Sequence, residues 1–197
     1  MHLDISIFFL LTQLFQYYCS PFIIINLILK KLILKKRNVY LSIGSNIGDK
    51  EYNLNLAIEQ IEESMGRIVK ISNFYSNPAE GFIGDDFLNA CLHIESNLSP
   101  DNLINSILKI ENLFGRKRKV NGVYESRNID IDIIFIDDII LKTQSLTVPH
   151  PRMHTRHFVL IPLCDISKEI FHPLKKKTVN ELLLNLPGRL DIIKVNS

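Results

Sequence analysis

From residue 38 onward, apolar and polar positions follow first the two-residue period of a strand and then the spacing of a helix. Residues 39–44 make a short alternation that ends at Gly44, which predicts a strand. Residues 52–62 carry apolar side chains on one helical face and acids on the other, which predicts a helix. The folded part of the chain therefore begins with a strand followed by a helix.

The same pattern continues through the middle of the chain. It predicts strands at 68–75 and 87–94, separated by a loop at 77–86 that contains proline and glycine. A helix is expected over 99–115, because a proline stands in its first turn. A further strand follows residue 128.

The order of these elements indicates a fold class. Strand, helix, strand, strand, helix, strand is the order of the ferredoxin-like unit, in which two helices cover one face of a four-stranded antiparallel sheet. We therefore expect an α+β fold with a ferredoxin-like βαββαβ core and a C-terminal extension. That extension contains a strand-like segment at 146–148 and a short helix near 179–186.

Residues 1–37 have a different character from the rest. Ile, Leu and Phe dominate from Ile5 to Leu34, and basic residues follow, which resembles a membrane segment with a cytoplasmic basic flank. Polar residues and a proline interrupt this run and count against an anchor, and the features of a secretory signal are missing. Three explanations stay open for 1–37: an anchor, a poorly ordered extension, or upstream sequence that is not translated. Residues 38–197 are expected to form one domain.

Composition and charge narrow the class of protein. The chain of 197 residues is 46% hydrophobic and 22% charged, which suits one domain with a buried core. A net charge of +2 lacks the basic excess typical of a nucleic-acid binder. Cys19, Cys91 and Cys164 are far apart, which argues against disulfides or a zinc site and fits a reducing cytoplasm.

The strand after residue 128 carries the candidate chemistry. Asp130 and Asp132 are two residues apart, so their carboxylates project from the same face of a strand. Five cations and one acid, Glu125, lie between Gly115 and Asn128. Paired aspartates alone are more often a solvated strand face, but hard oxygen ligands beside cations suit magnesium and a polyphosphate. The sequence therefore predicts phosphoryl-type transfer.

Six motifs occur in an order seen in one enzyme family. They are Gly44-Ser45-Asn46, Phe74-Tyr75 with Gly81-Phe82, Phe87-Leu88-Asn89-Ala90, Gly115-Arg116-x-Arg118, Ser126-Arg127-x-x-Asp130-x-Asp132, and Val148-Pro149-His150-Pro151-Arg152-Met153 through Arg156-x-Phe158. From about residue 38 to 186 the chain resembles the 6-hydroxymethyl-7,8-dihydropterin pyrophosphokinases. The resemblance implies transfer of the terminal pyrophosphate of ATP to the hydroxymethyl group of the pterin, with release of AMP, in folate biosynthesis.

The resemblance also implies roles for individual residues. Asp130 and Asp132 would hold two Mg²⁺ ions, with ATP as co-substrate, and Arg116 and Arg127 would grip the transferring phosphates. Such transfer depends on positioning and charge neutralisation, so no nucleophilic side chain is required. The nucleotide would be bound by Glu111, Arg118, Lys119, Ile133, His150 and Arg156. The pterin would be bound by Pro78, Gly81, Asn89 and Phe158.

Other interpretations of these residues stay open without the resemblance. Phe158 lies in an apolar run and would suit the core, Arg118 and Lys119 would suit a solvated charge run, and His150 would suit a packing or capping role. Two residues depart from the family pattern, because Glu125 adds an acid near the phosphates and Ser145 replaces an arginine of some relatives.

The expected partners are the small molecules ATP and hydroxymethyl-dihydropterin, with no nucleic acid. We expect a monomer, and membrane contact only if the N-terminal segment is an anchor. The alternative function is another two-metal nucleotidyl or phosphoryl transferase on a ferredoxin-like palm, but the motifs after Thr147 have no place there.

Overall fold

The structure is a computed structural model that describes residues 36–79, 83–115, 126–188 and 192–195. The predictions made for the N-terminal segment fall outside these ranges, apart from its last two residues. Within the described ranges, no helix has both the length and the apolar character that crossing a bilayer requires.

The central strand of the main sheet is β1 (Arg37–Ser45). It pairs antiparallel with β4 (Phe87–Ser96) on one side and with β5 (Asp130–Ile136) on the other. The strands beyond β4 are β2 (Arg67–Ile71), β3 (Phe74–Asn77) and β10 (Ile193–Val195). The order is β10-β3-β4-β1-β5, with β2 also pairing with β4, so the expected mixture of helices and antiparallel sheet is confirmed.

The sheet in the described part of the chain has six strands, where four were expected. One reason is that the strand predicted at 68–75 is broken between β2 and β3. At the break, Ser72 Oγ accepts the backbone N–H of Cys91 at 2.9 Å, and the N–H of Asn73 turns away to Asp165 Oδ2 at 3.1 Å. The hydroxyl of Ser72 therefore takes the place of a backbone carbonyl as the partner of the Cys91 N–H on β4. The other reason is β10, which adds to the edge at β3.

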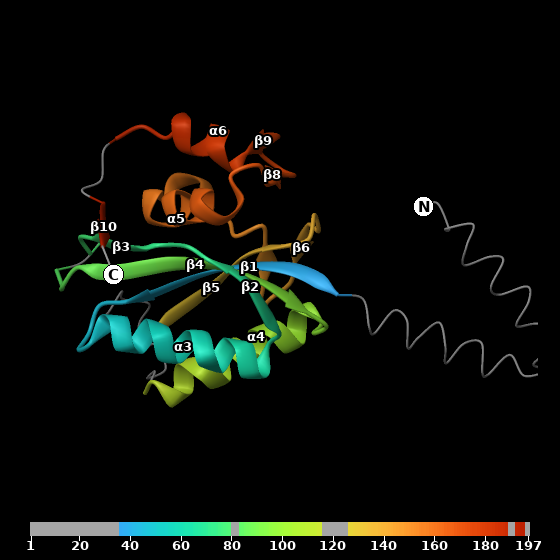
Figure 1. Ribbon diagram of the computed structural model, residues 1–197. Helices are drawn as coiled ribbons and strands as arrows, with labels where there is room; N and C mark the ends of the chain where they lie inside the picture. Colours follow the sequence, from blue (N-terminus) through green and yellow to red (C-terminus); the bar gives the residue numbers. More distant parts are fainter. Residues whose placement is uncertain (1–35, 80–82, 116–125, 189–191, 196–197) are drawn as a thin grey trace, which may run out of the picture. The chain divides into compact units, whose positions relative to one another are not determined.

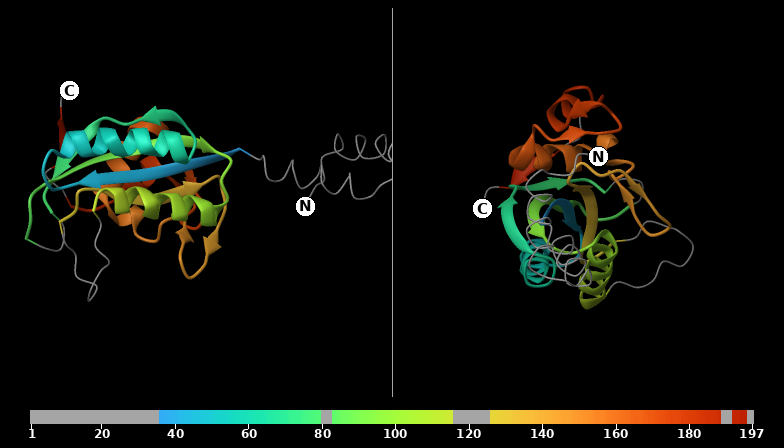
Figure 2. Two further views of the ribbon diagram at one scale, coloured as in Figure 1. Left: turned by 90° about the horizontal axis from the view of Figure 1, so that it is seen from below. Right: turned by 90° about the vertical axis from the view of Figure 1, so that its right-hand side faces the viewer.

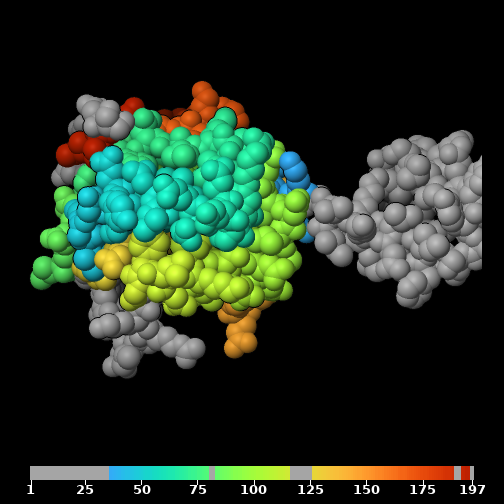
Figure 3. All heavy atoms as spheres, turned by 60° about the horizontal axis from the view of Figure 1, so that its bottom comes forward, coloured from blue at the N-terminus to red at the C-terminus, as the bar shows by residue number. Residues whose placement is uncertain are grey.

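Two helices cover one face of the sheet. They are α3 (Lys50–Ser64) and α4 (Pro100–Leu113), and Figure 3 shows them side by side over this face. Both begin at a side-chain cap, because Asp49 accepts the N–H of Tyr52 and Ser99 accepts that of Asn102. Their buried faces pack on the apolar side chains of β1, β4 and β5, as the periodicity predicted.

A second apolar layer lies on the opposite face, under α5 (His157–Ser167) and α6 (Val179–Leu184), as Figures 1 and 2 show. The expected helix near 179–186 is thus present and ends at Leu184. No prediction was made for α5, because a short apolar run containing Pro162 has no period that separates helix from strand. The packing of α5 in this layer holds the segment before it, residues 149–156, beside β5.

Short elements connect the two layers. The segment predicted at 146–148 is the two-residue strand β7 (Thr147–Val148), which pairs with β6 (Leu141–Lys142). A 3₁₀ turn, η1 (Met153–Thr155), follows, and its Met153 is fully buried. The hairpin of β8 (Phe171–His172) and β9 (Lys177–Thr178) precedes α6. The strand β7 and the turn η1 bring residues 150–156 beside β5.

Candidate active site

A row of paired residues crosses the centre of the sheet. Gly44 on β1 pairs with Asp130 on β5 and with Asn89 on β4. Paired residues project from the same face, which here is opposite to the face that Leu41 and Ile43 bury under α3 and α4. Because Gly44 has no side chain, the amide of Asn89 reaches over it, and a Cβ would lie 2.5 Å from Asn89 Oδ1. The row places a carboxylate on β5 and an amide on β4, on either side of β1.

Asp132 lies on the same face of β5 as Asp130. Burial, followed by the negative charge of Asp130, raises the pKa of Asp132 from 3.8 to about 6, although three nearby arginines lower it. A carboxylate pair that resists carrying two negative charges gains from a bound cation. The pair therefore has the electrostatics of a cation site.

Arg127 lies directly against this pair. Its Nη1 makes an ion pair with Asp130 Oδ1, and its side chain is mostly buried. The backbone of Arg127 is held by the fully buried Asn46, whose Oδ1 accepts the Arg127 N–H at 2.7 Å. The amide of Asn46 also donates to Ser126 Oγ at 3.0 Å and to the carbonyl of Asp85 at 3.3 Å. Asn46 thus fixes the chain on which Arg127 is carried.

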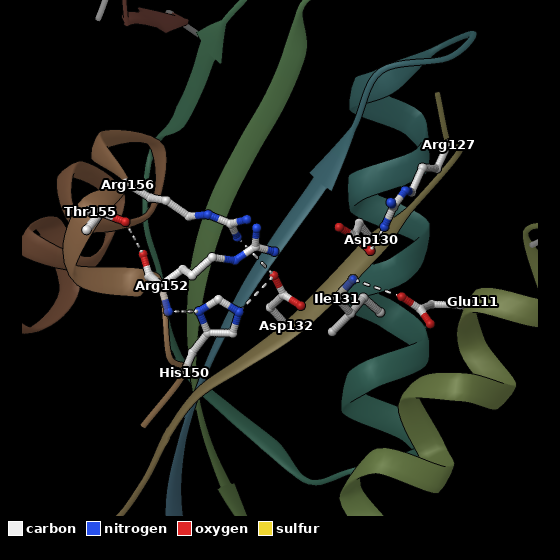
Figure 4. A network of polar contacts seen from close by, with 9 residues as sticks. All are labelled: Glu111, Arg127, Asp130, Ile131, Asp132, His150, Arg152, Thr155 and Arg156. Carbon is white, nitrogen blue, oxygen red and sulfur yellow. Dashed lines mark hydrogen bonds and ion pairs between the residues drawn. The ribbon is translucent and has the colours of Figure 1, made fainter. Parts of the chain in front are cut away.

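Three further side chains reach Asp132 from the segment between β7 and α5, and Figure 4 shows them converging on its carboxylate. His150 Nε2 lies 3.8 Å and Arg156 Nη1 lies 3.7 Å from Asp132 Oδ2. Arg152 extends alongside Arg156 toward the same carboxylate. Two arginines and a histidine therefore surround one end of the aspartate pair.

His150 is a neutral group in this cluster. Burial lowers the pKa of His150 to about 4, and the positive charges of Arg156 and Arg152 act in the same direction. Its Nδ1 accepts the backbone N–H of Arg152 at 3.3 Å, so the ring proton is on Nε2, the atom that faces Asp132. At pH 7 His150 is therefore a hydrogen-bond donor and not an ion-pair partner.

Two of the predicted pterin-binding residues, Asn89 and Phe158, lie near this cluster. Asn89 is almost fully buried, and its Nδ2 donates to Asn77 Oδ1 at 2.5 Å. Asn77 Nδ2 in turn donates to the carbonyl of Pro78 at 2.8 Å. Phe158 is partly buried, and the guanidinium carbon of Arg156 lies 5.3 Å from its ring centroid. Arg156 therefore links the Phe158 ring to the aspartate pair.

Two predicted nucleotide-binding residues lie elsewhere. Glu111 is 1% exposed on the buried face of α4, where its Oε1 accepts the N–H of Ile131 at 3.1 Å. Ile133 belongs to the core layer under α3 and α4. The structure brings neither side chain to the face that carries Asp130 and Asp132.

Four predicted site residues lie outside the described residues: Gly81, Arg116, Arg118 and Lys119. The same holds for Glu125, the acid that departs from the family pattern. Among the residues that the structure does describe, no cluster of three or more His, Cys, Asp and Glu side chains could hold a metal. A metal at Asp130 and Asp132 would therefore need further oxygen ligands from water or a bound phosphate.

Sequence reasoning assigned no role to Asn46, Asn77 or Arg152. Asn46 and Arg152 stand inside quoted motifs, so position in a motif was a signal that could have found them. Asn77 had no such signal, because a polar residue before a proline reads as the start of a loop. Its importance depends on a partner 12 residues away in sequence.

Comparison with known proteins identifies relatives of this chain. The model of one family, described as 7,8-dihydro-6-hydroxymethylpterin-pyrophosphokinase (HPPK), matches residues 40–168. The 2-amino-4-hydroxy-6-hydroxymethyldihydropteridine pyrophosphokinase of Aquifex aeolicus is 39% identical over 144 residues, which are 73% of this chain and 88% of that protein.

Longer proteins also contain a similar part. The folic acid synthesis protein FOL1 of Dictyostelium discoideum is 39% identical over 153 residues, covering 76% of this chain and 22% of that protein. A crystal structure of Plasmodium falciparum HPPK-DHPS has a TM-score of 0.65 with 16% identity, covering 78% of this chain and 44% of that one. At that identity the structural likeness concerns the fold alone.

Proposed function

The chain belongs to the 7,8-dihydro-6-hydroxymethylpterin-pyrophosphokinase family, and from that membership we propose how its own residues serve the reaction. The enzyme transfers the pyrophosphoryl group of ATP to 6-hydroxymethyl-7,8-dihydropterin, releasing AMP, in folate biosynthesis. One observation carries the assignment: Asp130 and Asn89 flank Gly44 on one face of the sheet. The proposed phosphate and pterin sites then lie on β5 and β4, the two strands that flank β1.

Asp130 and Asp132 fit a magnesium site. They offer hard carboxylate oxygens on one face. The raised pKa of Asp132 shows that its negative charge is unfavourable there, so a nearby positive charge would stabilise the ionised pair. We propose two Mg²⁺ ions with ATP as co-substrate. When bound, magnesium supplies positive charge to the phosphate oxygens and orients them.

Arginines and a histidine then serve the nucleotide phosphates. Arg156 and the Nε2–H of His150 approach Asp132 at 3.7 and 3.8 Å, so they border any group that sits on this carboxylate. Arg127, now paired with Asp130, becomes available to a phosphate once a cation neutralises that carboxylate. We assign the same task to Arg116 and nucleotide contacts to Arg118 and Lys119, from their motif.

The transfer itself needs orientation more than acid or base strength. The substrate hydroxyl must lie in line with the β-phosphorus, and the residues around Asp132 must neutralise charge that shifts toward the leaving AMP. His150 remains neutral, so it donates a hydrogen bond without taking the proton. The hydroxyl proton leaves to solvent in this proposal.

The pterin ring is proposed to bind at Asn89 and Phe158. A buried amide with a fixed partner presents hydrogen-bonding atoms to a ring edge, and an aromatic face stacks on a flat ring. Pro78 and Gly81 would line the same pocket from the loop after β3. The resemblance assigns Glu111 and Ile133 to nucleotide binding. In this proposal Glu111 would instead hold the backbone of β5 at Ile131, and the side chain of Ile133 would pack in the core.

We infer that the core is ferredoxin-like. Counting β2 and β3 as one broken strand gives the order β2/β3-β4-β1-β5, in which α3 and α4 cross on one face. We assign this domain to 38–197, with 1–37 as a separate extension. We further propose a cytoplasmic monomer, in which a reducing compartment keeps the thiols of Cys91 and Cys164 free.

The assay for this function supplies Mg²⁺, ATP and 6-hydroxymethyl-7,8-dihydropterin and separates the nucleotide products. AMP should form only when the pterin is present, and removing magnesium with EDTA should stop its formation. ADP or free pyrophosphate as the main product would instead favour the alternative, another two-metal transferase on the same type of fold.

A further inference from the structure

We infer that Asn77 is a positioning residue that fixes which end of the Asn89 amide faces the pterin site. The inference rests on the proposed binding of the pterin by Asn89. The proposed function assigns Asn77 no part, and a hydrogen bond to Asn89 connects its side chain to the site. It concerns the selection of the substrate ring and not the transfer of the pyrophosphoryl group.

The two amides form a short hydrogen-bonded chain that begins at a backbone group. The carbonyl of Pro78 accepts from Asn77 Nδ2 at 2.8 Å, and Asn77 Oδ1 accepts from Asn89 Nδ2 at 2.5 Å. Each asparagine is 4% exposed, so solvent cannot readily replace these partners. The side chains come from β3 and β4, on strands whose pairing places Asn77 opposite Phe87 and Tyr75 opposite Asn89.

The direction of this chain is determined at the carbonyl. A backbone carbonyl only accepts, so Asn77 must turn its NH₂ group toward Pro78 and its oxygen toward Asn89. Asn89 must then turn its NH₂ group toward Asn77, because two amide oxygens in contact would leave both without a donor. Reversing either amide breaks a hydrogen bond in a nearly solvent-free site. The carbonyl of Pro78 thus determines the orientation of the Asn89 amide, through Asn77.

The free end of the Asn89 amide faces the centre of the site. Its Oδ1 lies over Gly44, where a Cβ would come within 2.5 Å, and this is the direction of Asp130 along the cross-strand row. Asn89 therefore offers an acceptor on the β1 side and retains one N–H donor for a ligand. A ring edge that carries a donor next to an acceptor, as a cyclic amide does, matches this pair of groups.

Four variants test the inference by steady-state kinetics with each substrate varied in turn. Asn77→Leu keeps the approximate size and removes both polar atoms, and it should raise KM for the pterin roughly 10-fold while KM for ATP stays near the wild-type value. Asn77→Thr keeps a hydroxyl that both donates and accepts, in a residue that favours strands, and should recover part of the loss. Ser76→Ala, on the opposite face of β3, is the matched control and should change neither constant.

The fourth variant separates positioning from general packing. In an Asn89→Ala background, Asn77→Leu should add little to the KM for the pterin, because the residue that it positions is gone. Full additivity of the two effects would overturn the inference. Equal rises in both KM values, or a wild-type KM in folded Asn77→Leu, would overturn it as well. A wild-type enzyme that forms no AMP from these substrates would instead reject the proposed function.

Discussion

Glu111 Oε1 accepts the backbone N–H of Ile131 at 3.1 Å, and Ile131 is the residue between the two aspartates of β5. Glu111→Ala leaves that N–H without its partner in a buried layer, which should cost about 1–3 kcal/mol of unfolding free energy. The carboxylates on the other face should shift with the strand, so kcat should fall. Urea unfolding and steady-state kinetics measure both effects.

Glu111→Gln is the matched control, because its side-chain oxygen still accepts from Ile131. It should unfold close to the wild type and keep most of its kcat. A rise in KM for ATP in both variants, without a loss of stability, would show direct nucleotide binding by Glu111 instead.

Asp132→Asn should abolish turnover. It should also make the unfolding free energy of the metal-free protein depend less on pH. The pKa of Asp132 is raised to about 6 from 3.8, so the folded state holds this proton more tightly than the unfolded state. Its contribution to stability is therefore complete below pH 3.8 and is lost as the pH rises through about 6. Urea unfolding in EDTA from pH 4 to 7 should show this loss in the wild type and not in the variant.

The opposite pH dependence is expected at His172. Burial lowers its pKa to about 4, with the positive charges of His154 and Lys175 acting in the same direction. The unfolded state therefore takes up the proton first, and stability that is complete above pH 6.5 is lost as the pH falls toward 4. His172→Gln should reduce this loss, as measured by unfolding at pH 7.5 and pH 5.

The two trends overlap between pH 4 and 6, so His172→Gln is best measured in the Asp132→Asn background. An unchanged difference in stability between pH 7.5 and pH 5 would contradict a neutral, buried His172.

Gly44→Ala should disturb the pterin site through Asn89. The added Cβ would lie 2.5 Å from Asn89 Oδ1, which forces the amide to move at a cost of about 1–3 kcal/mol. KM for the pterin should rise more than KM for ATP. The double variant with Asn89→Ala should recover the lost stability, because the clashing oxygen is absent, and a failure to recover would place the strain elsewhere.

The sequence predicted the elements around the site well, because each has a strong local signal. The helix expected at 52–62 appears as α3, and the pair of aspartates lies on one face of β5, as the two-residue period requires. Proline in the first turn correctly located the start of α4. These features depend on neighbours within a few residues.

Features that depend on distant partners could not be predicted. Ser72 interrupts a strand through a hydrogen bond to Cys91, and Asn77 acquires its significance from Asn89. The burial of Glu111 under β5 likewise follows from how α4 packs and not from its place in the sequence. The local sequence pattern does not report contacts between residues that are distant in sequence. The buried hydrogen bonds of the site could therefore not be predicted before the fold was known.

With the pterin at Asn89 and the phosphates at Asp130, as proposed, the pairing of Gly44 with both residues also limits the length of the substrate. The two outer residues are separated by two steps between neighbouring strands, or about 10 Å at roughly 4.8 Å per step. This interval is maintained by backbone hydrogen bonds on both sides of β1, so side-chain substitutions cannot lengthen it. An alcohol carried on a longer tether from the ring would consequently overshoot the phosphates, whatever its affinity for the ring pocket.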